Sequence, residues 1–222
     1  MGERFAGFEP GAGESFSAAE CLVGVVRRLL DDGRDARIAL AGNGEVILLP
    51  RAGRCLVLVR DMVAFCQASA AAFEIALIEP GSITPGAAGR DIDELLWQIG
   101  FHASRGLLLE GLSEYDVVQF SRWPNLSRLP TTPNAMRICA LLVNHSTSIM
   151  MARRRLRVDS GEIRRIYTAA SLAGIARVLN RKSAESSVEP MSPGDVPEIG
   201  GANGQAGPST IFGILFNRIS GM

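Results

Sequence analysis

The spacing of apolar and polar residues predicts an amphipathic helix near the start of the chain. Ser17 and Glu20 have the spacing of a capping box, in which each side chain bonds to a backbone N–H at the helix start. Apolar residues then recur every three or four positions, and Gly33 suits the end of the helix. The residues expected on its buried face are Leu22, Val25, Val26 and Leu29.

Short apolar runs separated by glycine-containing turns follow this helix and predict a sheet. The turns are Gly-Asn-Gly at 42–44 and Ala-Gly at 52–53, both suited to hairpins. Residues 61–73 read as a helix between the last two strands. The expected strands are 36–42, 45–50, 54–60 and 74–80. The pattern therefore predicts the α+β fold class, with a small N-terminal α/β-sandwich-like domain and a mostly antiparallel sheet over residues 16–105, after a flexible segment at 1–15.

A second capping box, formed by Asp91 and Glu94, opens another amphipathic helix. Its expected buried residues are Ile92, Leu95, Leu96 and Ile99. Residues 106–131 then form a connector, with short extended pieces expected at 107–109 and 117–120. Three prolines in 122–133 exclude one continuous regular element there.

Helical spacing returns at residue 132 and predicts three helices followed by a strand. The first begins at Pro133 with Ile138, Leu141 and Leu142 inward, together with Ala135 or Met136. The second covers 148–157, with Ile149, Ala152 and Leu156 inward. The third begins after Asp159, which forms a capping box with Glu162, and ends near Gly174; Ile163, Ile166, Tyr167 and Ala170 are expected inside, and 175–179 reads as a short strand.

The tight turn at 158–160 between the second and third helices, and the strand after them, carry a resemblance. The segment 132–182 resembles a winged helix-turn-helix domain over about 50 residues. The resemblance implies that the exposed face of the third helix binds DNA. Other domains of this type bind proteins instead, so both partners stay open.

Charge separates along the chain in a way that bears on this choice. The formal net charge is zero, yet residues 134–182 carry nine arginines and one lysine against Asp159 and Glu162, a net charge of +8. Clustered cations bind phosphate by releasing counterions. On this interpretation Arg164, Arg165 and Thr168 face outward and read bases, and the other arginines contact phosphate. The full set of expected nucleic-acid residues is Arg153, Arg154, Arg155, Arg157, Arg164, Arg165, Thr168 and Arg177.

Arginine is also the general cation of this chain, which weakens that inference. Only Lys182 among the 23 basic residues is a lysine, a bias typical of proteins from GC-rich bacterial genomes. A protein-binding face and an inert solvated face therefore remain alternatives to nucleic-acid binding.

Two further features suggest partner binding. Trp123 stands beside Pro124, where it either fills a core pocket, the favoured interpretation, or contacts a partner.

Residues 183–207 are rich in Ser, Pro, Gly and acid and are expected to be a disordered tether. Residues 208–222 are expected to form an amphipathic helix that either docks on a partner or caps its own domain; its apolar residues are Ile211, Phe212, Leu215, Phe216 and Ile219.

Composition and motifs argue against several classes of protein. The chain has no long apolar run, no secretory signal pattern, four scattered cysteines and two isolated histidines. We therefore expect a cytoplasmic protein without membrane span, metal, cofactor or catalytic site. The leading hypothesis is a bacterial DNA-binding regulator with an N-terminal sensor or dimerisation domain, so that a homodimer is an expected assembly. The alternative is a signalling adaptor that binds proteins in a motility, secretion or cyclic-dinucleotide pathway.

Overall fold

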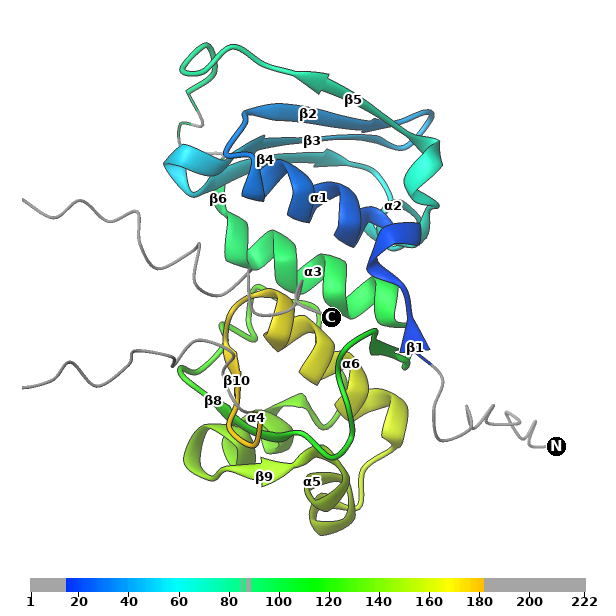
Figure 1. Ribbon diagram of the computed structural model, residues 1–222, viewed down its shortest axis with the longest axis vertical. Coiled ribbons are helices and arrows are strands. Elements are labelled where there is room, and N and C mark those ends of the chain that lie inside the picture. The colour runs from blue at the N-terminus through cyan, green and yellow to red at the C-terminus, as the bar shows by residue number, and fades with distance from the viewer. Residues whose placement is uncertain (1–14, 85, 87–88, 182–222) are drawn as a thin grey trace, which may run out of the picture. The chain divides into compact units, whose positions relative to one another are not determined.

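A computed structural model of the chain describes residues 15–84, 86 and 89–181, and it has an α+β architecture (Figure 1). Apart from Ser15, which belongs to a short strand and not to a flexible segment, the expected N-terminal segment 1–15, the tether and the terminal helix fall on residues 1–14 and 182–222. They lie outside the described residues. In the described part of the chain, no helix is long and apolar enough to cross a membrane.

A five-stranded antiparallel sheet forms the first half of the structure; four of its strands were predicted from the sequence, and the short edge strand at Arg90–Asp91 was not. The strand order is β5-β2-β3-β4-β6, so that β5 and β6 are the edges. Val46 lies between Ile38 and Val57, and Leu48 lies between Ala36 and Cys55, which places an apolar row on one face. The strands are β2 Ala36–Leu40, β3 Gly44–Leu49, β4 Arg54–Val59, β5 Phe73–Leu77 and β6 Arg90–Asp91.

Three helices cover this apolar face: α1 Leu22–Asp31, α2 Met62–Gln67 and α3 Ile92–Ser104 (Figure 1). The residues predicted to be inward on α1 and α3 are all buried. The helix expected at 61–73 ends early, at Gln67, and a 3-10 turn at Ala70–Ala72 precedes β5. This break occurs because Ser69 is extended and bridges to Cys21.

The prediction that Ser17 and Glu20 form a capping box at the start of the first helix was wrong. Cys21, in the extended conformation, is the N-cap of α1, and Ser17 precedes a separate 3-10 turn at Ala18–Glu20 without a side-chain cap bond. The bridge between Cys21 and Ser69 holds the chain extended at this point, so a helix starting at Ser17 cannot run through it. Asp91 is the N-cap of α3 as expected, but its carboxylate accepts from Arg54 Nη1 at 2.6 Å instead of capping the helix.

The second half contains three helices and a small antiparallel sheet. On α4, Ala135 is buried and Met136 is exposed, which decides between the two residues that the sequence left open. The helix begins at Ala135, two residues after the predicted start at Pro133. The sheet order is β10-β8-β9, so a strand from the connector lies between the strands that flank α5 and α6. The N-terminal strand β1, Ser15–Phe16, pairs with β7, Leu108–Leu109. The other elements of the second half are β8 Val117–Phe120, α4 Ala135–Asn144, β9 Thr147–Ser148, α5 Ile149–Leu156, α6 Ser160–Leu172 and β10 Ala176–Val178.

Local hydrogen bonds explain the starts of α5 and α6. The Ser148 hydroxyl accepts from Met151 N at 3.2 Å, and Asp159 Oδ2 accepts from Glu162 N at 3.1 Å. Arg157 ends α5 in the left-handed conformation, with φ of 52°. The turn between the two helices is therefore as tight as the sequence suggested.

Helices α3 and α6 make the most extensive contact between the two halves of the described chain. Gly100 lies at their crossing: a Cβ atom added there would lie 2.9 Å from Ala169 Cα and 3.1 Å from Thr168 O. Trp97 and Phe101 of α3 belong to the same buried cluster as the inward residues of α4 and α6. The described residues up to Asn180 thus pack as one compact unit.

Candidate functional site

The face of α6 that was expected to read DNA bases is buried. Arg164 is 5% exposed and Thr168 is fully buried. Arg164 Nε donates to Glu114 Oε1 at 2.7 Å, and its Nη2 lies 2.6 Å from the same oxygen. The prediction that Arg164 and Thr168 face outward was therefore wrong, because Glu114 pairs with one and α3 covers the other.

Arg165, the third residue of that face, is only partly exposed. Its guanidinium carbon lies 5.9 Å from the centre of the Phe101 ring, a cation–π distance. Burial and then the charge of Arg165 lower the pKa of His102. Arg165 thus contacts α3 side chains instead of projecting freely into solvent.

A cluster of charged groups at the end of α5 is exposed instead. We define the α5 basic surface as the side chains of Arg154, Arg155 and Arg157, all exposed, with Arg153 partly exposed beside them. Among the described residues, none of the four has a carboxylate within ion-pair distance. Arg137 supports this end of α5, because its Nη2 donates to Leu156 O at 2.9 Å.

Arg177, the remaining expected nucleic-acid residue, is exposed on β10. It pairs across the small sheet with Gln119 of β8. Six of the eight expected residues are therefore at least partly exposed: the four at α5, Arg165 on α6 and Arg177 on β10. Arg164 and Thr168, two of the three residues expected to read bases, are buried.

The favoured interpretation of Trp123, filling a core pocket, was wrong, since this side chain is 46% exposed. The buried tryptophan that holds the proline-containing segment is Trp97, whose Nε1 donates to Pro130 O at 3.1 Å. Pro124 and Leu129 provide the buried apolar contacts of the segment. Trp123 therefore keeps only its alternative interpretation, as a partner-binding residue. The other expected partner-binding residues, on the terminal helix, lie outside the described residues.

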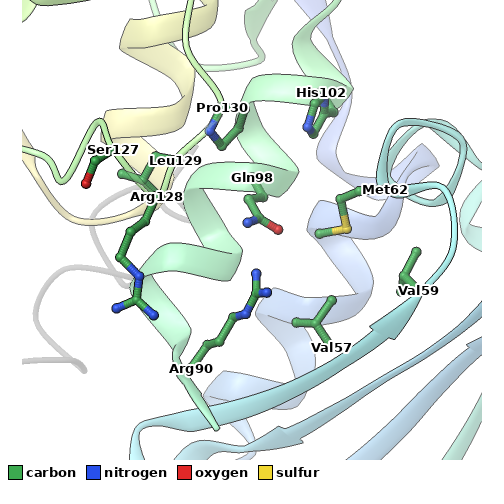
Figure 2. Close-up of a pocket in the computed structure, with 10 residues that line it drawn as sticks. All are labelled: Val57, Val59, Met62, Arg90, Gln98, His102, Ser127, Arg128, Leu129 and Pro130. Carbon is green, nitrogen blue, oxygen red and sulfur yellow. The ribbon is translucent and has the colours of Figure 1, made fainter. Parts of the chain in front are cut away.

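A cavity of about 380 Å³ opens between β4, the start of α2, α3 and the segment around Pro130 (Figure 2). Val57, Val59 and Met62 line one side of it. Figure 2 shows Arg90 and Gln98 pointing toward one another across its opening. Arg128 lies at the rim, 3.4 Å from Glu94, whereas Arg90 has no ion-pair partner among the described residues.

This cavity combines an apolar wall with a guanidinium and an amide, an arrangement that suits a small molecule with a carboxylate or phosphate group. The sequence did not predict this cavity. Arg90 belongs to a strand of only two residues, and Gln98 belongs to a helix for which the sequence predicts only the buried apolar face. His102 was noted only as isolated. No local motif joins these residues, since the fold alone brings them together.

The described side chains offer no reactive thiol and no metal centre. Burial raises the pKa of Cys21, that of Cys55 to about 11 and those of Cys66 and Cys139 to about 12, so these thiols stay protonated at neutral pH. Over the described ranges, no three His, Cys, Asp or Glu side chains converge as metal ligands do.

Comparison with protein-family models, with curated proteins and with solved structures finds no match to this chain.

Proposed function

We propose that this chain is a non-enzymatic regulatory protein that acts by binding another protein, with the α5 basic surface as the contact. The observation that carries the proposal is the burial of α6 against α3. Thr168 is fully covered and Arg164 is paired with Glu114, so neither of these two α6 side chains is free to enter a DNA groove. In this proposal the three helices and their small sheet form a winged-helix-like unit whose third helix has a structural role.

The charge of the exposed surface supports an acidic partner. Arg154, Arg155 and Arg157 have no carboxylate partner among the described residues, so their charges are available to another molecule. Arginine is well suited to such a contact because its planar guanidinium pairs with a carboxylate through two parallel hydrogen bonds. Met151, on the same helix and 51% exposed, adds apolar area that a partner protein would cover.

A photo-crosslinking residue in place of Arg155 tests the proposal in the host cell. The same residue in place of Arg28, an exposed arginine on α1, is the matched control. We expect a protein adduct at position 155 that is absent at position 28 and that disappears when Arg154 and Arg157 are changed to Glu. Equal crosslinking at both positions would contradict a specific contact at α5.

DNA binding is the second candidate function, because the α5 basic surface can also contact phosphates without reading bases. Fluorescence anisotropy of a labelled random duplex with the full chain, over a salt series, decides between the two. The protein-binding proposal predicts no complex tighter than about 100 µM at physiological salt, the weak end of non-specific DNA binding. Tighter binding with a steep salt dependence, lost in Arg154→Ala/Arg155→Ala but kept in Arg28→Ala/Arg34→Ala, would establish the DNA candidate instead.

A further inference from the structure

The strand β5 is an exposed edge of the five-stranded sheet. Figure 1 shows β5 at the margin of the sheet, with no other strand on its far side. Phe73 is buried, but the four residues after it are exposed, including two large apolar side chains: Ile75 is 38% exposed and Leu77 is 51% exposed. Natural proteins usually protect such edges with charged side chains, Pro or a bulge; β5 has no Lys or Pro, pairs with β2 in a continuous register, and carries a single charge, on Glu74.

The hydrogen-bonding pattern identifies which backbone groups point outward from this edge. Ile78 N donates to Asp35 O at 2.9 Å, which makes these two residues a hydrogen-bonded pair. Such pairs alternate along an antiparallel ladder, so Glu74 and Ala76 also bond to β2. The N–H and C=O groups of Phe73, Ile75 and Leu77 therefore face away from the sheet.

We propose that β5 pairs with β5 of a second copy of the chain, antiparallel about a two-fold axis at Ile75. This register places Ile75 opposite Ile75 of the second copy, and Phe73 opposite its Leu77. All three outward-facing residues then meet outward-facing residues, and about six main-chain hydrogen bonds form. The apolar side chains lie on the same face, so Ile75 and Leu77 of both copies become covered together.

The charges on the opposite face of the sheet match the same register. Glu74 of the second copy would lie opposite Ala76, and Ala76 lies opposite Arg37 of β2. Because alanine is short, the Glu74 carboxylate can reach the Arg37 guanidinium over it. Glu74 has no ion pair among the described residues, whereas Arg37 is half exposed and bonded to Glu45 on its other side. The two-fold axis repeats this contact. No like charges lie directly opposite each other; the two Glu74 side chains are diagonal neighbours across the axis, and each also has Arg37 of its own chain as a diagonal neighbour on β2.

This arrangement joins two five-stranded sheets into one continuous sheet. It does not depend on what the α5 basic surface binds. Its partner is specific because a second copy supplies both the free backbone groups at the matching spacing and the carboxylate for Arg37.

Sedimentation equilibrium of the full chain tests the proposal. We expect a reversible dimer, with the amides of Ile75 and Leu77 protected from hydrogen exchange only at concentrations where the dimer forms. Glu74→Arg places like charges against Arg37 twice per dimer, and it should raise the dissociation constant by at least about tenfold. Glu79→Arg, an equal charge change at an exposed position outside β5, is the control.

A double variant that exchanges the two charges tests the contact between Glu74 and Arg37 directly. Glu74→Arg combined with Arg37→Glu should recover most of the lost affinity, because the opposite charges are restored with their positions exchanged. A monomer at every concentration up to the order of 100 µM would overturn the proposal. So would a dimer that Glu74→Arg affects no more than Glu79→Arg, or one in which the β5 amides exchange as fast as in the monomer.

Discussion

Replacing Gly100 with alanine tests the α3–α6 crossing, on which the proposed function depends. In a helix that is exposed at this position, Gly→Ala stabilises by about 1 kcal/mol, since alanine has the higher helix propensity. In this structure the new Cβ would lie 2.9 Å from both Ala169 Cα and Leu172 Cδ1, and 3.1 Å from Thr168 O. Two of these three atoms belong to the backbone and cannot rotate away.

The steric cost exceeds the propensity gain. Overpacking a well-packed contact costs about 1–3 kcal/mol, and fixed backbone neighbours place this position near the upper value. Subtracting the gain of about 1 kcal/mol leaves a net destabilisation of about 2 kcal/mol. For a chain of this size, that corresponds to a fall in melting temperature of about 4–8 °C.

Urea unfolding measures the effect directly. Trp97 is fully buried and lies one turn from Gly100, so its fluorescence reports this crossing; a Trp123→Phe background removes the exposed second tryptophan. Ala103→Gly on the same helix is the control, and it should show the ordinary propensity loss of about 1 kcal/mol. If Gly100→Ala instead leaves stability unchanged or raises it, α3 and α6 do not cross closely, α6 is free to enter a groove, and the proposed function loses its basis.

Three further predictions concern buried polar groups. Tyr167→Phe removes the bond from the tyrosine hydroxyl to Asp116 Oδ2, 2.6 Å long and buried, so urea unfolding should show a loss of about 1–3 kcal/mol. Arg164→Ala should lower the melting temperature by several degrees because it leaves Glu114 unpaired, whereas Arg154→Ala, on the surface, should change stability by less than about 0.5 kcal/mol. Burial and the nearby Arg165 lower the pKa of His102 in the folded state, so the unfolded state binds its proton first as pH falls below about 6.5. Stability should therefore decrease from that pH down to the folded-state pKa, and urea midpoints of His102→Gln should show a weaker decrease.

Local pattern was a good guide to the elements and to one face of each helix. The strand at 117–120 and the cap at Asp159 were found where the sequence placed them. The predictions of exposed residues failed where a helix is covered by other elements on more than one side. In α6, Thr168 and Ala169 form a small-residue surface that meets Gly100, and eight of its thirteen residues are buried. That density of apolar and small residues was the available signal that α6 is covered on more than one side.

The candidate sites were less predictable than the fold. Arg154, Arg155 and Arg157 were identified because an exposed charge cluster on one helix is visible in sequence. Arg90 and Gln98 were not, because they meet across a cavity whose walls come from β4, α2, β6, α3 and the segment 127–130. The two tryptophans were equally hard to predict. Trp97 lies in a helix and Trp123 lies beside Pro124, and only the packing of the fold shows that the first is buried and the second exposed.

The sequence alone establishes the α+β class, the antiparallel strands, the amphipathic helices and the charge separation, because periodicity and capping act over a few neighbouring residues. The tertiary structure decides the rest. It inserts β8 between β9 and β10, buries Arg164 against Glu114 fifty residues away, and leaves β5 as an unprotected edge. These outcomes depend on which distant segments share a core and on which backbone groups remain unpaired after folding. A local pattern of polar and apolar residues does not contain that information.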